Sequence, residues 1–395
     1  MAFELLLKRV PEIQSELRAA RLDGWLLYDL HARNTVTSKL TGLGDLTRRY
    51  FIMIPAQGEP FAVSHKIEDV NWAGWPWQRE KYAGWKELDA ALRKAIGGGQ
   101  RVAMEISNND AVPAMDLVPV GVVEMIRALG LDVTSSGDLV SRFYAAWSAA
   151  DLASHRRSSV ILAQVAHAAF MRIAQEITAG NAVHEGEIAA WIIAELTARG
   201  CGTGAENIVA NGINAANPHY APEGLGAQFK RNDVVLIDLW AKENDNTVFS
   251  DQTWMGYLGS AVPERIANIF SVVTGGRDAA VNFLNETYAA GRVPAGGEVD
   301  DVTRKHISDR EYGHAFVHRT GHSIDQSVHG MGPNIDNLET NETRGLITGV
   351  AFSIEPGIYL AGDVGMRSEI NVYMSETGPE VTTPSPQTQM LALLP

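Results

Sequence analysis

Residues 234–239 read Val-Val-Leu-Ile-Asp-Leu, a near-continuous apolar run with one carboxylate, that of Asp238, inside it. Such a run is typical of a strand that is buried on both of its faces. A buried carboxylate without a partner costs several kcal/mol or takes up a proton. Asp238 therefore requires a cation, a metal ion or a cage of hydrogen-bond donors.

Two further acidic residues lie beside stretches that are predicted to form strands. Glu355 follows the apolar residues 350–354 and precedes a Pro-Gly turn signal. Residues 369–374 alternate, with Glu369 on the face opposite to the one formed by the apolar side chains. The same argument about buried charge therefore applies to both glutamates.

Asp251 and a group of histidines complete the polar set. Asp251 follows a short β-like stretch, residues 247–249, in an otherwise polar loop. Five of the 11 histidines lie close together in the sequence: His306, His314, His318, His322 and His329. A single acidic residue at a strand end usually caps a turn or pairs with arginine, and a single histidine is usually structural. Four acidic residues together with this histidine group indicate a metal site.

The number of carboxylates indicates how many ions the site binds. Four carboxylates around one divalent ion would leave excess negative charge buried, whereas two divalent ions balance them. Oxygen-rich ligands with a single imidazole favour manganese or a similar hard ion over a thiolate-type zinc site. Two such ions a few Å apart are suited to hydrolysis, because they generate hydroxide at neutral pH and stabilise a tetrahedral oxyanion.

The hydrophobic pattern predicts an α/β unit, followed by a change of composition near residues 145–155. In the first part, helices are predicted at residues 4–21, 87–96 and 117–129, and strands at residues 24–29, 50–55, 60–65 and 101–106, of which 50–55 and 60–65 are expected to form a hairpin. A further helix is predicted at residues 151–177, with one apolar face formed by Leu162, Ala166, Phe170, Ile173 and Ile177. Two more are predicted after Gly180, ending at Arg199-Gly200, and near residues 263–290. The rest of the second part is predicted to form mainly strands.

At the acidic and histidine motifs, the sequence resembles the pita-bread metallopeptidases, which include prolidase, Xaa-Pro aminopeptidase, methionine aminopeptidase and the metal-free creatinase. The resemblance is carried by residues 218–220 (PHY), 236–238 (LID), 250–253 (SDQT), 318–322 (HRTGH), 353–359 (SIEPGIY) and 366–369 (MRSE). It implies an α/β (α+β) fold with a pita-bread catalytic domain at residues 151–395. More weakly, residues 1–150 resemble the creatinase/prolidase-type N-terminal domain.

The resemblance also implies roles for individual residues. Five metal ligands are expected: Asp238, Asp251, His322, Glu355 and Glu369. Asp251 and Glu369 are expected to bridge the two ions, and Glu355 to pass a proton to the leaving amine. The remaining expected residues bind substrate: His219 and His329, which also hold the tetrahedral intermediate, His318 on the proline side, and Arg367, which orients acidic ligands.

The sequence is therefore interpreted as a metal-dependent Xaa-Pro dipeptidase, which hydrolyses the peptide bond before proline. Manganese is the favoured ion, with cobalt or zinc as alternatives. Two other functions stay open: an Xaa-Pro aminopeptidase that acts on longer peptides, and a non-catalytic pita-bread binding module. The compact length favours the dipeptidase. A homodimer is expected from the resemblance and from the prevalence of two-fold homo-oligomers.

Several positions depart from the family pattern. Asp238 and Asp251 are 13 positions apart instead of the usual 11. Other departures replace residues that the family usually has nearby: Trp240 replaces Gly, Val248 replaces Tyr, Trp254 replaces Arg and Asp325 replaces Gly. Because no ligand is lost, these departures bear on the surroundings of the ligands and on the fit of the substrate.

Composition excludes other classes of protein. The net charge of −14 argues against binding to nucleic acid, which requires clusters of lysine and arginine. Cys201 is the single cysteine, so the chain forms no internal disulfide, which fits a reducing cytoplasm. No stretch approaches the ~20 apolar residues of a membrane span, and the N-terminus lacks the apolar run of a signal peptide. A cytoplasmic protein is expected.

Overall fold

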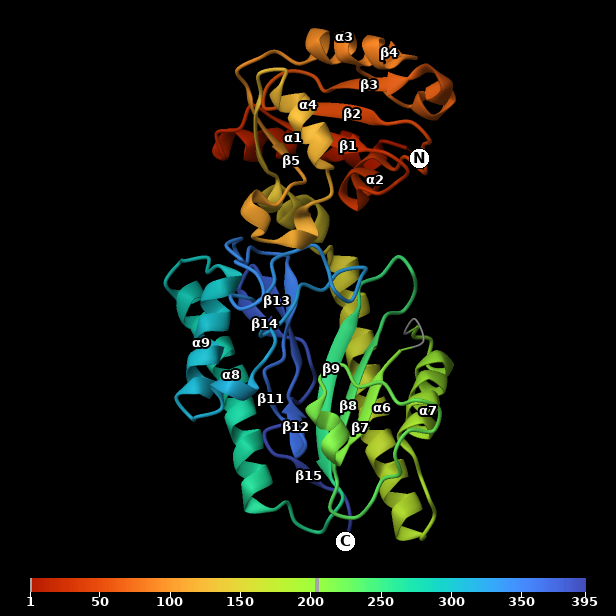
Figure 1. The fold of residues 1–395 in the computed structure, drawn as a ribbon, viewed down its shortest axis with the longest axis vertical. Coiled ribbons are helices and arrows are strands. Elements are labelled where there is room, and N and C mark those ends of the chain that lie inside the picture. The colour runs from red at the N-terminus through yellow and green to blue at the C-terminus, as the bar shows by residue number, and fades with distance from the viewer. Residues whose placement is uncertain (1, 203–205) are drawn as a thin grey trace. The chain divides into compact units, whose positions relative to one another are not determined.

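The structure, a computed structural model, describes residues 2–202 and 206–395. The chain divides into two units, Met1–Tyr144 and Ala145–Pro395, and each has its own sheets and its own apolar core (Figure 1). That residues 1–150 and 151–395 are two separate domains stays a prediction. No helix in the described ranges is long and apolar enough to cross a membrane.

The first unit is built on one six-stranded sheet. Its strands are β1 (Gly24–Asp29), β2 (Tyr50–Pro55), β3 (Phe61–His65), β4 (Gln78–Tyr82), β5 (Arg101–Met104) and β6 (Asp132–Ser135), in the order β4-β3-β2-β1-β5-β6. Its α-helices are α1 (Glu4–Ala19), α2 (Thr35–Thr41), α3 (Trp85–Ala95), α4 (Val120–Arg127) and α5 (Gly137–Val140). Its 3₁₀ helices are η1 (Lys66–Trp72), η2 (Asn108–Asp110) and η3 (Pro113–Met115). The predicted hairpin is confirmed, because β2 pairs with β3 antiparallel.

In its described residues, 145–202 and 206–395, the second unit contains three sheets and four long helices. Its strands are β7 (Ile208–Asn211), β8 (Val234–Ala241), β9 (Ser250–Tyr257), β10 (Ala351–Ile354), β11 (Gly357–Leu360), β12 (Val364–Arg367), β13 (Ile370–Ser375), β14 (Gly378–Val381) and β15 (Leu391–Ala392). The sheet orders are β15-β9-β8-β7, β10-β13-β14 and β11-β12. The α-helices are α6 (Ala149–Thr178), α7 (Glu185–Ala198), α8 (Glu264–Ala289) and α9 (Gly296–Ser308), and the 3₁₀ helices are η5 (Gly212–Ala216) and η6 (Gly313–Ala315).

Helices cover the strands of the second unit from both sides. Figure 1 shows α6 and α7 on one side of the strands and α8 and α9 on the other. Helix α6 begins at a capping box, in which Ser148 and Asp151 each accept a hydrogen bond from the other's backbone N–H. Its predicted apolar face is confirmed: Phe170 and Ile173 are buried in a cluster that includes Ile237 of β8. This packing holds the strands that carry the site.

The sequence interpretation missed helix α9, as well as the short helices α2 and α5. The prediction that this region forms mainly strands was wrong at residues 296–308, which form a helix. The helix gives a weak signal because these residues begin with two glycines and carry few apolar side chains. Gly296 cannot be replaced here, since a Cβ atom would lie 1.7 Å from the carbonyl oxygen of Asn334. The helix therefore starts with poor helix formers because the chain passes so close to it. The β-like stretch at 247–249 is likewise not a strand, and β9 begins at Ser250.

Candidate metal centre

Two of the expected carboxylate ligands lie on neighbouring strands of one sheet. β8 pairs with β9 antiparallel, with Asp238 opposite Thr253 and Trp240 opposite Asp251. Residues that face each other across two strands, and residues two apart along one strand, share a face of the sheet. The carboxylates of Asp238 and Asp251 therefore project from the same face, and both residues are buried.

The other two carboxylates come from a second sheet. β10 pairs with β13 antiparallel, with Ile354 opposite Ile370. Glu355 directly follows β10 and Glu369 directly precedes β13, so the two glutamates form the next facing pair beyond the ladder. The backbone N–H of Glu369 donates to the carbonyl oxygen of Thr253 at 3.4 Å, which joins this sheet to β9.

Backbone contacts with β10 fix the position of His322. The N–H of His322 donates to Ser353 Oγ at 2.9 Å, and the N–H of Ser353 donates back to the carbonyl oxygen of His322 at 2.9 Å. A Cβ atom at Gly321 would lie 1.9 Å from the carbonyl oxygen of Ser353. The glycine of the motif at residues 318–322 therefore allows the close approach that brings His322 to the carboxylates.

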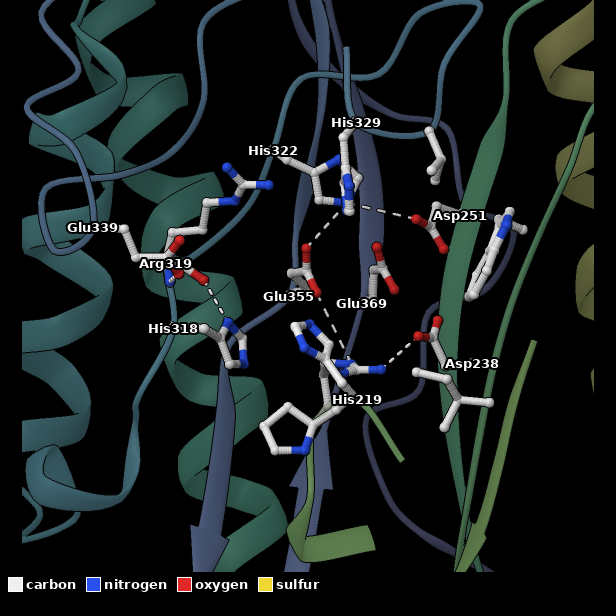
Figure 2. A pocket seen from close by; sticks show the side chains of 15 residues that line it. His219, Asp238, Asp251, His318, Arg319, His322, His329, Glu339, Glu355 and Glu369 are labelled. Atoms are coloured by element: carbon white, nitrogen blue, oxygen red, sulfur yellow. Dashed lines mark hydrogen bonds and ion pairs between the residues drawn. The ribbon is translucent and has the colours of Figure 1, made fainter. Parts of the chain in front are cut away.

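The five expected ligands meet in one pocket (Figure 2). His322 Nε2 lies 3.5 Å from Asp251 Oδ2 and 3.2 Å from Glu355 Oε1. Asp251, His322 and Glu369 each offer one ligand atom, and these atoms all lie within 4.8 Å of one another. Such spacing is close enough for a shared cation.

Three oxygens of this cluster lack hydrogen-bond donors. Asp238 Oδ1, Asp251 Oδ1 and Glu369 Oε1 are buried, and none accepts a hydrogen bond from the part of the chain that the structure describes. A buried acceptor without a donor carries its full desolvation cost. Oxygen donors of this kind, with one imidazole beside them, fit hard divalent cations. The residues present therefore fit a divalent metal site.

Electrostatics point the same way. Burial raises the pKa of Asp251 and that of Glu369 well above their ordinary values, and neighbouring carboxylates raise both further. Burial also raises the pKa of Asp238, although Arg367 opposes this. For Glu355, burial raises the pKa, but His322 and other cationic neighbours outweigh it and bring the pKa below its ordinary value. The cluster thus needs added positive charge to hold all four carboxylates ionised.

Arg367 is the buried cation that contacts the cluster. Its Nη2 donates to Asp238 Oδ2 at 2.5 Å, and its Nε donates to Thr253 Oγ1 at 2.9 Å. Thr253 Oγ1 donates in turn to Glu369 Oε2 at 2.9 Å. Arg367 Nη1 donates to the hydroxyl of Tyr359 at 3.2 Å. Arg367 therefore orients acidic side chains, as expected of a group behind the ligands.

Three further histidines line the pocket, each from a different segment. His329 lies edge-on to His322 with ring centroids 4.4 Å apart, and burial, followed by nearby cationic groups, lowers its pKa to about 4. His318 contacts the Tyr359 hydroxyl through Nε2 at 2.9 Å, and burial lowers its pKa. His219 reaches the pocket from the segment between η5 and β8 (Figure 2).

Two of the clustered histidines do not take part. His306 lies on α9 and His314 on η6, and neither lines the pocket. Sequence reasoning did not single out Arg319 and Glu339, which line the pocket, nor Thr253 and Tyr359, which contact the groups behind the ligands. Thr253 and Tyr359 stand in motifs quoted above. Thr253 is two residues after Asp251, so strand alternation places it on the ligand face. The position of Tyr359 carries no comparable signal.

The departures from the family pattern fall into three groups. Trp254 and Val248 are buried in apolar clusters and do not line the pocket. Trp240 does line the pocket, beside Asp238 and Asp251. Asp325 accepts hydrogen bonds from Ser327 N at 2.7 Å and Met331 N at 2.9 Å, and so closes the loop that carries His329.

Several known proteins are similar to this chain in sequence. The sequence profile of metallopeptidase family M24 matches residues 156–376. The chain is 36% identical to the Xaa-Pro dipeptidase of Lactobacillus delbrueckii subsp. lactis over 167 residues, which cover 42% of this chain and 41% of that protein. It is 26% identical to the probable dipeptidase PepE of Mycobacterium tuberculosis, over 89% of this chain and 86% of the relative.

A solved structure extends the likeness to the whole fold. Dipeptidase PepE from Mycobacterium ulcerans superposes with a TM-score of 0.75 at 22% identity, and the superposition covers 100% of both chains. Together with the family match, this confirms the fold expected from the resemblance, an N-terminal α/β part followed by a pita-bread part. Membership also implies divalent metal ions, for which the cluster of Asp251, His322 and Glu369 is suited. The chain belongs to metallopeptidase family M24.

Proposed function

We propose that this protein is an Xaa-Pro dipeptidase that uses two divalent metal ions. The observation that carries the proposal is a set of three buried carboxylate oxygens, of Asp238, Asp251 and Glu369, which accept no hydrogen bond from the described residues and line the same pocket as His322. The Xaa-Pro dipeptidases among the relatives support the substrate class. The substrate is accordingly a small proline-containing peptide.

Five side chains are proposed to hold the ions: Asp238, Asp251, His322, Glu355 and Glu369. Four carboxylates and one imidazole form a site in which oxygen ligands predominate, which favours manganese, with cobalt or zinc as alternatives. Four carboxylates carry the charge that two divalent ions balance. Bound ions lower the pKa of water and polarise the scissile carbonyl.

The protein's own groups are proposed to bind the peptide and move the proton. The lowered pKa of Glu355 keeps its carboxylate ionised, so it can accept a proton and pass it to the proline nitrogen as the bond breaks. His329, with a pKa of about 4, is neutral at pH 7 and can donate one N–H to the developing oxyanion. His219 is proposed to hold the substrate beside it. His318 is proposed to line the proline side, and Arg367, joined to it through Tyr359, to orient the acidic ligands.

Two broader alternatives are separated by experiment. An Xaa-Pro aminopeptidase would also cleave peptides that continue beyond proline. A non-catalytic binding module would bind no stoichiometric metal and would cleave neither Xaa-Pro dipeptides nor longer Xaa-Pro peptides. We further propose a homodimer, which sedimentation equilibrium checks directly.

The test combines metal analysis with cleavage of Gly-Pro, Ala-Pro and Ala-Pro-Ala, before and after loading with manganese. About two ions per chain, with cleavage of the dipeptides alone, is the expected result. Cleavage of the tripeptide would change the assignment to aminopeptidase. A pure protein without bound metal and without activity on any of the three peptides would overturn the proposal.

A further inference from the structure

Glu185, the first residue of α7, is a buried acid outside the metal centre. Its Oε1 accepts hydrogen bonds from Asn211 N at 2.8 Å and from Asn214 Nδ2 at 2.9 Å. Its Oε2 accepts from the Tyr220 hydroxyl at 2.6 Å and from Ala227 N at 2.7 Å. One carboxylate therefore holds four points along residues 211–227.

Glycines allow this segment to lie against the start of α7. A Cβ atom at Gly186 would lie 2.2 Å from the carbonyl oxygen of Gly224. At Gly226, where φ is +67°, a Cβ atom would lie 2.7 Å from Glu185 Oε2. Gly186 N also donates to Leu225 O at 2.9 Å. The close approach at two glycines indicates that the contact with Glu185 is built into the fold.

His219 stands inside the segment that Glu185 holds. It directly precedes Tyr220 and is exposed, while its imidazole faces the pocket (Figure 2). Among the described residues, the backbone N–H of His219 donates only to Asn217 Oδ1, at 3.2 Å, and Asn217 belongs to the same segment. Besides the anchors at Glu185, Arg367 Nη1 donates to the carbonyl oxygen of Pro218 at a long 3.4 Å, and η5 packs against β12, where a Cβ atom at Gly365 would lie 1.7 Å from the carbonyl oxygen of Ala215. Glu185 holds the segment on both sides of His219, at residues 211 and 214 before it and at residues 220 and 227 after it.

We propose that Glu185 is a positioning residue, which holds His219 in place against the substrate. This inference rests on the proposed function, because it needs His219 to contact the peptide. Glu185 itself lies outside the residues that line the pocket, so it acts through His219. A displacement of about 1 Å at a group that contacts substrate can lower the rate by about two orders of magnitude.

The substitution Glu185→Gln tests the four-point contact with almost no change in volume. The amide keeps one acceptor oxygen and replaces the other with an NH₂ donor, which faces donors on two sides. We expect kcat/KM for Ala-Pro to fall about 10- to 100-fold, with metal content unchanged. In the His219→Ala background the same substitution should change kcat/KM less than about two-fold, because both changes act through one group.

A matched control lies two residues along the same helix. Glu187 accepts hydrogen bonds from His184 at the start of α7 and makes none to residues 211–227. Glu187→Gln should leave kcat/KM within about two-fold of wild type. Should Glu185→Gln fail to fold, Tyr220→Phe removes a single anchor and should lower kcat/KM about 3- to 10-fold in the wild-type background only.

Amide hydrogen exchange supplies a readout that does not depend on activity. In Glu185→Gln loaded with diamagnetic zinc, the amides of Asn211 and Ala227 should exchange at least about ten-fold faster than in zinc-loaded wild type, and the His219 ring resonances should broaden or shift. A wild type that cleaves no Xaa-Pro peptide would refute the proposed function, while exchange and the His219 resonances would still report on positioning. Equal losses of kcat/KM with and without His219, or unchanged exchange, would overturn the inference.

Discussion

Neutralising one carboxylate of the metal centre should stabilise the metal-free protein. In Asp251→Asn, the side chain keeps its shape but loses the charge that faces Glu369, whose ligand atom lies within 4.8 Å of that of Asp251. At this separation two unit charges repel by about 3 kcal/mol with an effective dielectric constant of about 20. Wild type avoids part of this cost by protonation, because the pKa of each group is raised.

The sign of the pH dependence follows from these raised pKa values. A carboxyl group with a higher pKa in the folded state binds its proton more tightly there, so stability falls as the pH rises above the unfolded value. The gain from Asp251→Asn should therefore be small near pH 4 and grow toward pH 8, to about 2 kcal/mol. For a unit of this size, that gain corresponds to a rise in Tm of about 4–8 °C.

Calorimetry of chelator-treated protein measures this effect. Asp245→Asn serves as the control, because Asp245 is exposed and should give no pH-dependent change. With manganese present the order should reverse, since the variant loses a ligand and binds metal more weakly. The reasoning would be refuted if metal-free Asp251→Asn were less stable than wild type at pH 8.

Three further predictions concern groups behind the ligands and in the core. Thr253→Val removes the hydrogen bonds to Glu369 and Arg367; isothermal titration should show manganese affinity lowered about 10- to 100-fold, and unchanged affinity would contradict the relay. Arg367→Met leaves Asp238 Oδ2 without its donor. Urea unfolding of the metal-free protein should show a free energy of unfolding about 3–5 kcal/mol lower than in wild type; a decrease of less than about 1 kcal/mol would show that the ion pair adds little. Burial lowers the pKa of His155 from 6.5 to about 4, so the unfolded chain binds a proton at this residue first as the pH falls. Between pH 6.5 and 4, the free energy of unfolding should therefore decrease by about 3 kcal/mol more in wild type than in His155→Gln. Parallel pH profiles of the two proteins would contradict this.

Much of the site could be predicted from local sequence because charge in an apolar run is a strong signal. Asp238 stands inside a buried strand, and its need for a partner follows from desolvation alone. That its partner is Arg367 could not be derived from pattern, because 129 positions separate the two residues. The pairing arises where β12 and β8 meet, which only the fold specifies.

Other features were missed for related reasons. Helix α9 carries large apolar side chains only at Val299, Val302 and Ile307, and it opens with two glycines, so helical periodicity is weak. Glu185 belongs to a short polar motif whose N-terminal position suggests simple helix capping. Its four contacts extend over residues 211–227 and depend on how the chain returns to α7. Long-range hydrogen bonding of this kind leaves no periodic trace in the sequence.

The junction at which Glu369 N donates to Thr253 O has a kinetic consequence for the proposed metal centre. Two carboxylates come from β8 and β9, and two from the ends of β10 and β13, so neither sheet can assemble the centre alone. Capture of metal by the complete ligand set must then follow the docking of the two sheets. Conversely, an ion can leave only as fast as the sheets separate or the ligands turn aside. The dissociation rate of the metal would thus report the rate of opening motions at this junction.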